Sequence, residues 1–439
     1  MEIDMKLMSL FDGSGGFPLA ASLCGIEPVY AAEVEPYPIA VTKNRFPKMK
    51  HLGDVSKVKG GEIEPVDIIT FGSPCQDISI AGKRAGLKHA DMGDDETTRS
   101  GLFLEAIRII KEMREATNGV YPRYAIWENV PGAFSSNRGE DFRTVLEEFI
   151  RVKEKDAVMP AVPQAGWAYA DCISRDGWSI AYRVFDAQYW GVPQRRRRIY
   201  LVADFRGECA QEILFKRESL RGYFEAGRTP WQGIAADAQK ISVCTDGKSP
   251  TLRAEAHGNA PYVINKKTLV YDTRGNGDGE TVPTITGDHN NRITDYTALC
   301  CEAVVYDGAN ITSPLNKTNP QAGDPCHTIS TDSRNYIVRR LTPTECARLQ
   351  GFPDWWGEIP KKDNLTDDEY VFWLNARNTY AKINNKTTKE YSKEQMLSWY
   401  NKLHSDSSEY KMWGNGIALP NALYVMQGIA EVVGVHHSK

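Results

Sequence analysis

Long apolar runs are missing from this 439-residue sequence, and so is any strong excess of charge of one sign. No stretch approaches the roughly 18 consecutive apolar residues that a membrane-spanning helix needs. Residues 1–11 contain no basic segment followed by a cleavable apolar core, so we expect no secretory leader. These absences predict a globular cytoplasmic protein without a membrane partner, and the length is sufficient for two or three domains.

The sequence also lacks the cysteine spacings that are typical of metal sites. The nine cysteines include no C-x-x-C pair, which argues against a zinc site, and we expect no bound metal. The cysteines stand singly except for Cys300 and Cys301, and their odd number fits the reduced thiols of a cytoplasm. The formal net charge of −4 excludes nucleic-acid binding by bulk charge, so any such binding must rest on local patches.

The sequence does contain a regular alternation of short apolar runs and amphipathic segments. Buried strands are predicted for the apolar runs 6–11, 29–34, 67–71, 124–127 and 199–205. Helices are predicted for 18–24, 100–117, 141–153 and 422–433. Strands that alternate with helices predict an α/β fold with a doubly wound, mostly parallel sheet.

A glycine-rich turn separates the first predicted strand from the first predicted helix. Phe11, Gly13, Gly15 and Gly16 follow the spacing G-x-G-G, which differs from the G-x-G-x-x-G of dinucleotide-binding proteins. Glycines at such a turn let a ligand approach the backbone closely, and the helix that follows offers free N–H groups. An ordinary tight turn remains the alternative.

Two further pairs of residues suit a nucleoside. Glu33 and Val34 end the second predicted strand, where an acid can bind ribose hydroxyls. Asp54 and Val55 follow a short extended stretch, where the carboxylate and the apolar side chain can hold an adenine ring. A nucleoside-bearing cofactor without a pyrophosphate fits all three segments, and S-adenosyl-L-methionine is the candidate. Solvent-exposed surface acids are the alternative.

Reactive side chains follow the ends of other predicted strands. Cys75 comes directly after a strand that Gly72, Ser73 and Pro74 terminate, which makes it a candidate nucleophile. A lone cysteine is more often a small buried thiol, so it needs activating partners elsewhere. Glu128 follows the strand 124–127, and four arginines, 195–198, precede the strand 199–205.

Together these segments resemble the DNA (cytosine-5)-methyltransferase family of the bacterial or phage type. The resemblance covers six motifs in the family's order: 11–16 (cofactor turn), 72–76 (nucleophile), 128–130 (Glu-Asn-Val), 194–198 (Gln-x-Arg-x-Arg), 340–353 and 414–416. It is weak over 154–178 and absent from 357–410. It implies the S-adenosylmethionine-dependent methyltransferase fold, methylation of C5 of cytosine in duplex DNA and, for such relatives, a setting in restriction–modification.

The resemblance also implies roles for individual residues. Cys75 is the expected nucleophile, Glu128 stabilises the adduct, and of Arg196 and Arg198 one is expected to reach the base or its sugar–phosphate while the other pairs structurally. The cofactor-binding residues implied are Phe11, Gly13, Gly15, Gly16, Glu33, Val34, Asp54, Val55, Asn415 and Gly416. Those implied at the flipped-out cytosine or the DNA are Ser73, Pro74, Gln76, Asn129 and Gln194, and the segment 76–99 resembles the family's mobile catalytic loop.

A change of character at residue 206 suggests the domain organisation. We expect a catalytic and cofactor-binding domain over 1–205 and a β-rich target-recognition domain over 206–338. A return segment over 339–439 carries an insertion at about 357–410. Similar units in the middle region contain threonine–aliphatic pairs that resemble target-recognition elements: Thr251–Leu252, Thr284–Ile285 and Thr328–Ile329.

Alternatives remain open from the sequence. The middle region has 14 basic and 16 acidic residues over 206–334, so a structural or protein-binding insertion is a rival interpretation. A tRNA cytosine-5 methyltransferase is the closest alternative enzyme, although its relatives lack a large recognition region. A DNA-binding protein without catalysis and a nicotinamide oxidoreductase are less favoured, because the catalytic set is intact and the glycine spacing is wrong. We expect a monomer that binds double-stranded DNA.

Overall fold

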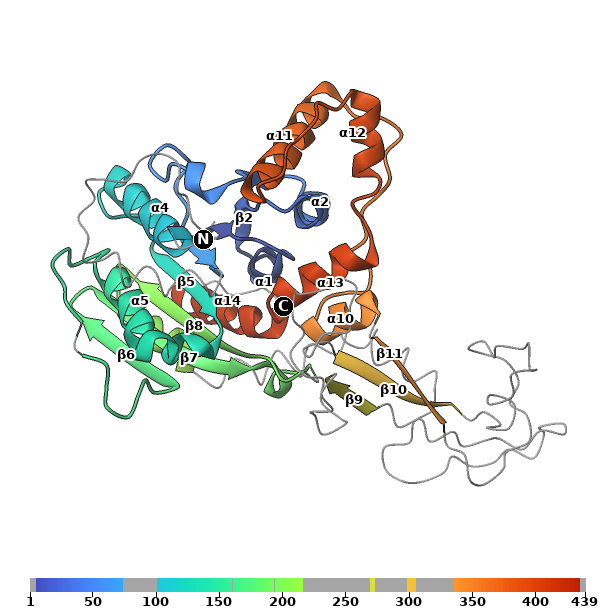
Figure 1. Cartoon of the computed structure of the whole chain (residues 1–439). Helices are drawn as coiled ribbons and strands as arrows, with labels where there is room; N and C mark the ends of the chain where they lie inside the picture. The colour runs from blue at the N-terminus through green and yellow to red at the C-terminus, as the bar shows by residue number, and fades with distance from the viewer. Residues whose placement is uncertain are drawn as a thin grey trace.

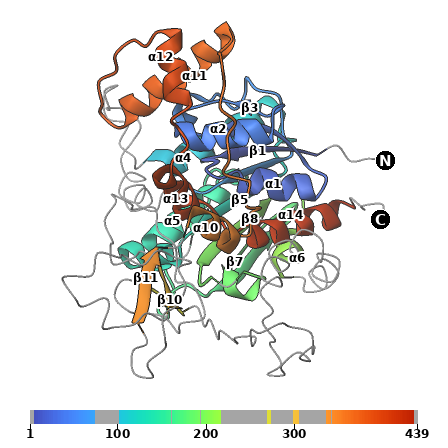
Figure 2. The same ribbon diagram turned by 90° about the vertical axis from the view of Figure 1, so that its right-hand side faces the viewer.

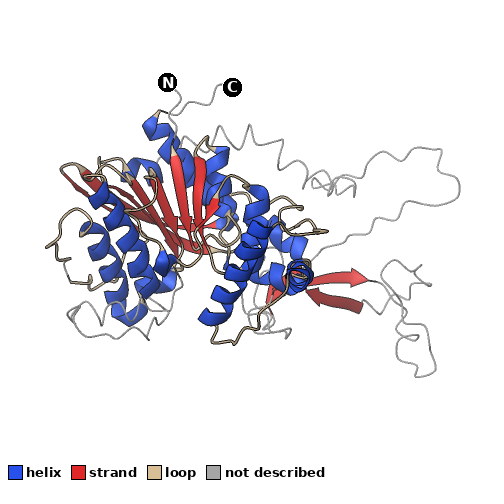
Figure 3. Ribbon diagram, turned by 90° about the horizontal axis from the view of Figure 1, so that it is seen from above, coloured by secondary structure: helices blue, strands red, loops and turns tan. Residues whose placement is uncertain are grey.

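The computed structural model describes residues 5–73, 101–159, 161–192, 194–215, 269–272, 298–304, 335–340 and 342–434. These residues form a large sheet with helices on both faces and a small sheet of three strands (Figure 1). From above, the large sheet lies between two layers of helices, and the small sheet projects to one side (Figure 3).

The large sheet has eight strands. Their bounds are Lys6–Leu10 (β1), Glu27–Ala32 (β2), Lys50–His51 (β3), Ile68–Phe71 (β4), Tyr124–Asn129 (β5), Ala170–Arg175 (β6), Trp178–Asp186 (β7) and Arg197–Asp204 (β8). Their order across the sheet is β3-β2-β1-β4-β5-β8-β7-β6. The first five are mutually parallel, whereas β8, β7 and β6 pair antiparallel with their neighbours. The expected mostly parallel α/β sheet is confirmed, with an antiparallel edge added to it.

The strand order reverses between β1 and β4. From β1 the chain moves outward to β2 and β3, and it then returns to form β4 and β5 on the other side. Ligands in open α/β sheets bind outside the carboxyl ends of the strands at such a reversal. The turn at residues 11–16 and the residues Gly72 and Ser73 lie at these two carboxyl ends.

Helices cover both faces of this sheet. Their bounds are Gly16–Leu23 (α1), Pro36–Arg45 (α2), Leu102–Ala116 (α4), Glu140–Ile150 (α5), Ala210–Phe215 (α6), Pro343–Gln350 (α10) and Leu419–Val433 (α14). One core lies beneath α1, α6 and α14, and the other beneath α4 and α5. Figure 2 shows α14 alongside α1, so the end of the chain packs against its beginning.

The helix expected over residues 100–117 is observed as α4, and one of its faces is buried. In α4 the side chains of Phe103, Ala106, Ile109, Ile110 and Met113 are buried. Burial of apolar surface contributes about 25 cal/mol per Å² to stability, and it is the main term that stabilises such a face. The fold of this half of the chain therefore follows from hydrophobic periodicity.

Strand boundaries differ from expectation at the residues that matter most. β5 continues through Glu128 and Asn129, which the sequence placed after the strand, because the antiparallel β8 supplies backbone partners at Tyr200 and Ile199. β8 likewise begins at Arg197 rather than at residue 199. β2 ends at Ala32, so Glu33 and Val34 lie in the loop beyond it.

Part of the predicted β-rich region is described. β9 (Leu269–Asp272), β10 (Ala298–Val304) and β11 (Asn335–Arg340) form an antiparallel sheet in the order β11-β10-β9. β11 begins within the expected β-rich region, 206–338, and ends two residues beyond it. The three threonine–aliphatic pairs lie outside the described residues, and the division into domains stays a prediction.

The insertion after residue 357 is helical. It contributes α11 (Asp367–Ile383), α12 (Lys393–Tyr400) and α13 (Asp406–Asn415), and Figure 1 shows α11 and α12 standing beside α2. Trp373, Met396 and Tyr400 pack there on Ile39 and Ala40 of α2.

Capping boxes begin two of the insertion's helices, with Thr366 and Glu369 at α11 and Ser392 and Gln395 at α12. These caps are readable in the sequence, which shows that local signals for the insertion were present even though it carries no motif.

Among the described helices, none is long and apolar enough to cross a membrane by itself. The bent pair α13 and α14, with 46° between them, meets the criterion by length and composition.

Candidate active site

The glycine-rich turn after β1 adopts a conformation that requires its glycines. Phe11 has φ 54°, Gly13 has φ 54° and Gly15 has φ 75°, all in the left-handed region. A Cβ on Gly15 would lie 2.7 Å from Thr42 Cγ2, and a Cβ on Gly16 would lie 2.5 Å from Ile417 Cγ1. The turn therefore packs too tightly against its neighbours for larger residues, as a close-fitting ligand loop does.

Glu33 holds this turn in place. Its Oε2 accepts a hydrogen bond from the Gly13 N–H at 2.9 Å, and its Oε1 accepts from the N–H groups of Val34 and Glu35 at 2.7 and 2.9 Å. A carboxylate has about four lone-pair sites, so capacity remains for a hydroxyl donor. The position at the end of β2 is the one where an acid is expected to bind a ribose.

Asp54 and Val55 follow the short strand β3, as expected, and Asp54 is the N-cap of a short 3-10 helix, Val55–Lys57. Asp54 Oδ1 accepts hydrogen bonds from Ser56 N at 3.0 Å and Ser56 Oγ at 2.8 Å, and the Val55 side chain is buried. Asp54 therefore caps this helix through one oxygen. Its contact with an adenine stays a prediction.

Asp12 is a residue that our sequence reasoning missed. It lies between the glycines, is only 7% exposed, and neither carboxyl oxygen has a hydrogen-bond partner among the described residues. Burial raises the pKa of Asp12 to about 7, and the nearby hydroxyl of Ser9 only partly offsets this rise. An acid within a tight glycine turn is a readable signal, because the turn leaves little room for water.

The C-terminal motif lies against the glycine turn, as the resemblance implied. A Cβ on Gly416 would lie 2.8 Å from Ser14 Oγ, so the two backbones meet closely. Trp356 Nε1 donates to the Ser14 carbonyl at 2.7 Å from a third segment. Asn415 is exposed beside this contact. Segments more than 300 residues apart thus build one side of the site.

Ser73 ties the start of the nucleophile motif to β5. Trp127 Nε1 donates to Ser73 Oγ at 3.2 Å, and Asn129 Nδ2 donates to the Ser73 carbonyl at 3.0 Å. The residue between these two donors is Glu128. A Cβ on Gly72 would lie 3.2 Å from Glu128 Oε2, so the chain passes directly beside this carboxyl group.

Glu128 is buried and paired with an arginine. Arg198 Nε lies 3.1 Å from Glu128 Oε1, which is an ion pair by distance although the geometry is not that of a hydrogen bond. Burial raises the pKa of Glu128, against the lowering influence first of Arg198 and then of Arg196. Tyr200 lies opposite Glu128 on β8, is fully buried, and makes no hydrogen bond through its hydroxyl within the described residues.

Arg196 has a different environment from Arg198. It is 1% exposed, and its Nη2 donates to the carbonyls of Gly414, at 3.2 Å, and of Gly416. Its backbone N–H donates to Asp186 Oδ1 at 3.1 Å. Arg196 is therefore engaged with backbone carbonyls of the C-terminal motif, whereas Arg198 lies beside the acid.

Some of the other residues expected at the site are described by the structure, and the rest lie outside the described residues. Gln194 is fully buried, and within the described part of the chain neither end of its amide has a hydrogen-bond partner. Asn129 is engaged with Ser73. Outside the described residues lie Pro74, Cys75, Gln76, Thr251, Leu252, Thr284, Ile285, Thr328 and Ile329.

The geometry has two adjoining parts. One is a glycine turn with an acid beyond β2, suited to a nucleoside and to an amino-acid moiety that backbone groups can hold. The other is a buried acid–arginine pair at the carboxyl end of β5 and on the neighbouring β8, suited to a polar heterocycle with donor and acceptor groups on one edge. No group of three His, Cys, Asp or Glu side chains that could hold a metal occurs in the described ranges.

Comparison with protein families gives a match across most of the chain. The family model described as C-5 cytosine-specific DNA methylase matches residues 5–153 and 170–371. The gap between the two segments contains most of the stretch where the resemblance in the sequence was weak.

Two curated relatives cover most of this chain. A protein of Escherichia phage P1 named DNA N-6-adenine-methyltransferase is 28% identical over 97% of this chain and 61% of its own length. The type II methyltransferase M1.ScrFI of Lactococcus lactis subsp. cremoris is 27% identical over 83% of this chain and 73% of its own length. The chain thus spans less than two thirds of the phage relative.

The fold is similar to that of solved methyltransferases. The crystal structure of the S. pombe Dnmt2 methyltransferase matches with a TM-score of 0.50 and 14% identity, covering 98% of this chain and 99% of the other. At this identity the similarity supports the fold alone.

Proposed function

Because this chain belongs to the C-5 cytosine-specific DNA methylase family, we propose that it transfers a methyl group from S-adenosyl-L-methionine to C5 of cytosine in a specific duplex DNA sequence. The observation that carries this proposal is the attachment of Ser73 to both neighbours of Glu128. It brings the start of the nucleophile motif beside a buried acid that an arginine faces.

The proposed chemistry begins with Cys75. C5 of cytosine is a poor nucleophile within an aromatic ring, and addition of a thiolate at C6 places electron density on C5. The Cys75 sulfur forms a bond to C6, and C5 then takes the methyl group. Loss of the C5 proton to a base expels the thiolate and restores the ring. Cys75 lies outside the described residues, so its role rests on the motif and on the anchored Ser73.

Glu128 is proposed to donate a hydrogen bond to N3 of the cytosine. Addition at C6 makes N3 more basic, so a protonated carboxyl beside it stabilises the adduct. Burial raises the pKa of Glu128, which favours the protonated form that this role needs. The opposing charge of Arg198 limits the rise and holds the carboxyl in place.

The residues around the glycine turn fit S-adenosyl-L-methionine. The turn at Gly13 to Gly16 is closed by Ile417, and the Glu33 carboxylate is fixed by three backbone N–H groups with capacity left for a ribose hydroxyl. The cofactor supplies an electrophilic methyl group when bound. Arg196 contributes by holding the segment at Gly414 and Gly416 against this turn.

Cytosine inside a duplex is not accessible to such a site, so we propose that the base is flipped out. The region 206–338, with β9 to β11 and the threonine–aliphatic pairs, is proposed to read the DNA sequence. The domains 1–205 and 339–439 are proposed to form the catalytic part.

Methyl transfer to duplex DNA with labelled S-adenosyl-L-methionine tests the activity. Nucleoside analysis of the product is expected to show 5-methylcytosine. Label in N6-methyladenine, or only in tRNA, would contradict the proposal.

The covalent step has its own test. A duplex with 5-fluorocytosine at the target is expected to remain attached to the protein, because fluorine cannot leave as the C5 proton does. Cys75→Ala should abolish this attachment and the methyl transfer while retaining cofactor affinity. Cys172→Ala, a free half-buried thiol on β6, is the matched control and should behave like the wild type.

A further inference from the structure

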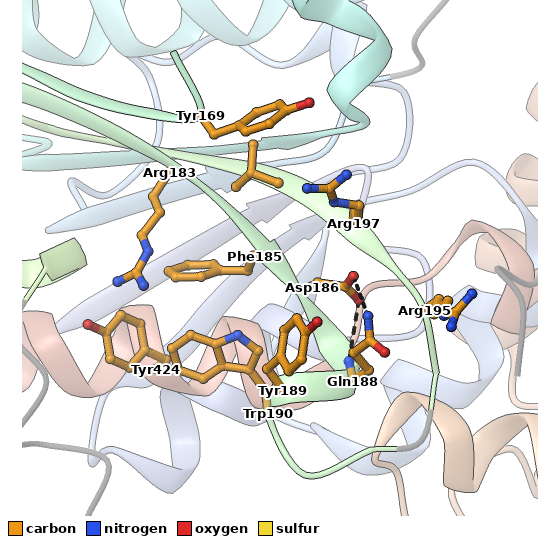
Figure 4. A pocket seen from close by; sticks show the side chains of 11 residues that line it. Tyr169, Arg183, Phe185, Asp186, Gln188, Tyr189, Trp190, Arg195, Arg197 and Tyr424 are labelled. Carbon is orange, nitrogen blue, oxygen red and sulfur yellow. Dashed lines mark hydrogen bonds between the residues drawn. The ribbon is translucent and has the colours of Figure 1, made fainter. Parts of the chain in front are cut away.

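A cavity at the tip of the β7–β8 hairpin is separate from the site described above. It has a volume of ≈ 790 Å³ and is lined by Tyr169, Arg183, Val184, Phe185, Asp186, Gln188, Tyr189, Trp190, Arg195, Arg197 and Tyr424. Figure 4 shows Tyr169 and Arg197 on one side and Trp190 and Tyr424 on the other. We name it the hairpin groove.

Three arginines make the hairpin groove basic. Arg195 and Arg197 are exposed, and Arg183 is half-buried with its Nη1 donating to the Leu214 carbonyl at 3.1 Å. One acid, Asp186, lies among them. Its oxygens accept from Gln188 Nε2 at 2.8 Å and from Arg196 N at 3.1 Å, so the acid is used within the hairpin. The formal charge of the lining is therefore positive.

Aromatic side chains form the rest of the lining. Tyr189 is 80% exposed and Tyr169 is 58% exposed, which is unusual for side chains of this size. Arg197 lies over the Tyr169 ring at 5.1 Å, and Arg183 lies over the Phe185 ring at 5.3 Å. Exposed aromatic rings beside arginines suit a ligand with a planar ring and a phosphate, because the ring can stack while the guanidinium groups bind the anion.

The groove is close to the catalytic residues but faces away from them. Along β8, Arg198 pairs with Glu128 whereas its neighbour Arg197 lines the groove, since successive side chains in a strand point to opposite faces. β5 and β7 flank β8, so the groove edge of β7 lies about 10 Å from β5, which is two strand spacings. This distance is on the order of a few nucleotide steps of 3.4 Å.

From this arrangement we propose that the hairpin groove binds a nucleotide of the DNA substrate outside the target cytosine. Arg195 and Arg197 hold its phosphates, and the Tyr189 ring stacks on its base or sugar. This proposal rests on the proposed function, because it takes the same DNA as its ligand. It also explains why four consecutive arginines occur: the alternate pair Arg196 and Arg198 serves the catalytic face, and Arg195 and Arg197 serve the groove.

The test measures DNA binding directly. Binding of a 30-base-pair duplex containing the recognised sequence is followed at several salt concentrations for the wild type and for Arg195→Ala/Arg197→Ala. Loss of two phosphate contacts should make the slope of log affinity against log salt shallower by about 1.8 and weaken binding at low salt by ~10-fold. The matched control is Arg175→Ala/Lys155→Ala, which removes two exposed positive charges elsewhere and should leave the slope unchanged.

Two further measurements separate a groove contact from other roles. Tyr189→Ala should raise the KM for DNA by ~10-fold with kcat and cofactor affinity retained, because stacking on one base contributes binding without touching the reacting atoms. Each variant should keep the melting temperature of the wild type, because the side chains of Tyr189, Arg195 and Arg197 are all exposed.

The outcomes are distinguishable. Unchanged slope and KM in the groove variants, with a wild type that methylates DNA, would overturn the hairpin-groove proposal alone. A wild type that binds duplex DNA without methylating it would overturn the proposed function instead. If deoxycytidine monophosphate binds the wild type and loses affinity in the groove variants while the duplex does not, the groove takes a free nucleotide and the assignment to DNA is wrong.

Discussion

Arg198 Nε lies 3.1 Å from Glu128 Oε1, and both side chains are nearly excluded from solvent. Burial raises the pKa of Glu128 while the guanidinium group lowers it. The carboxyl group is thus held between two opposing influences: burial raises its pKa, and the charges of Arg198 and, to a smaller extent, Arg196 lower it. The site can therefore be tested through this pair.

The rate of methyl transfer should depend on the protonated form of Glu128. A raised pKa means that the carboxyl stays protonated to higher pH than a free glutamic acid, and kcat should fall as pH rises through that pKa. Arg198→Met removes the main lowering influence, so the falling limb should move to higher pH although the rate itself is reduced. The pH profile of kcat at saturating DNA checks this. The control Arg175→Met should not shift the pH dependence of kcat. If Arg198→Met does not shift the falling limb either, the limb does not report the ionisation of Glu128.

The two family arginines should respond differently to substitution. Arg196→Lys retains the charge but loses the fork that spans the carbonyls of Gly414 and Gly416, so we expect a loss of about 2 kcal/mol in unfolding free energy and weaker cofactor binding. Arg198→Lys should lower kcat by ~10-fold or more and leave the free energy of unfolding nearly unchanged. Urea unfolding and single-turnover kinetics on both variants separate these effects. Equal stability losses in the two would contradict the division of roles.

Docking of the C-terminal motif on the glycine turn should be sensitive to one methyl group. In Gly16→Ala the new Cβ would lie 2.5 Å from Ile417 Cγ1, and overpacking of this kind costs about 1–3 kcal/mol. We expect a lower melting temperature and a raised Kd for S-adenosyl-L-methionine, measured by calorimetry. Gly101→Ala is the matched control, because a Cβ there meets nothing within 4 Å among the described residues. Identical behaviour of the two variants would show that the contact is unimportant.

Adjacent tryptophans provide a matched pair at the edge of the insertion. Trp356 Nε1 donates to the Ser14 carbonyl in the glycine turn at 2.7 Å, whereas Trp355 is 51% exposed. Trp356→Phe keeps an aromatic side chain, although a smaller one, and removes the N–H that donates to the buried Ser14 carbonyl, at about 1–3 kcal/mol. Cofactor affinity should fall in Trp356→Phe and stay near the wild-type value in Trp355→Phe. The opposite order would exclude this hydrogen bond as a support of the turn.

Asp12 should make stability depend on pH. Its pKa is raised from 3.8 to about 7, so the folded state keeps a proton that the unfolded state loses. The contribution of Asp12 to stability is full below pH 3.8 and is lost as pH rises through 7, by up to about 4 kcal/mol. Asp12→Asn carries no charge and should be more stable than the wild type at pH 8 but not at pH 3.5. Urea unfolding across this range measures the difference, and a pH-independent difference would contradict the burial of a charged Asp12.

Some features of the site followed from local patterns. The apolar periodicity of α4, the strand–turn–helix at residues 6–23 and the acid near the end of β2 are all short-range signals. The structure has each of these elements, with bounds that differ by a few residues from the prediction. The order of the motifs along the chain was sufficient to identify the family. Local sequence determines these features because strand alternation, helix faces and glycine turns depend on neighbours within a few residues.

Tertiary structure decided which side chains meet. From the sequence, Arg196 and Arg198 were expected to have different roles, but which arginine had which role was open. In the folded chain Arg198 lies beside Glu128, and Arg196 donates to the carbonyls of Gly414 and Gly416. The burial of the Asp12 carboxyl and the hairpin groove also depend on packing between distant segments. By itself, the sequence determined the α/β elements, the motifs and the family. The folded chain decided the environment of Glu128 and the different contacts of the two arginines, because electrostatics and burial act through space and not along the chain.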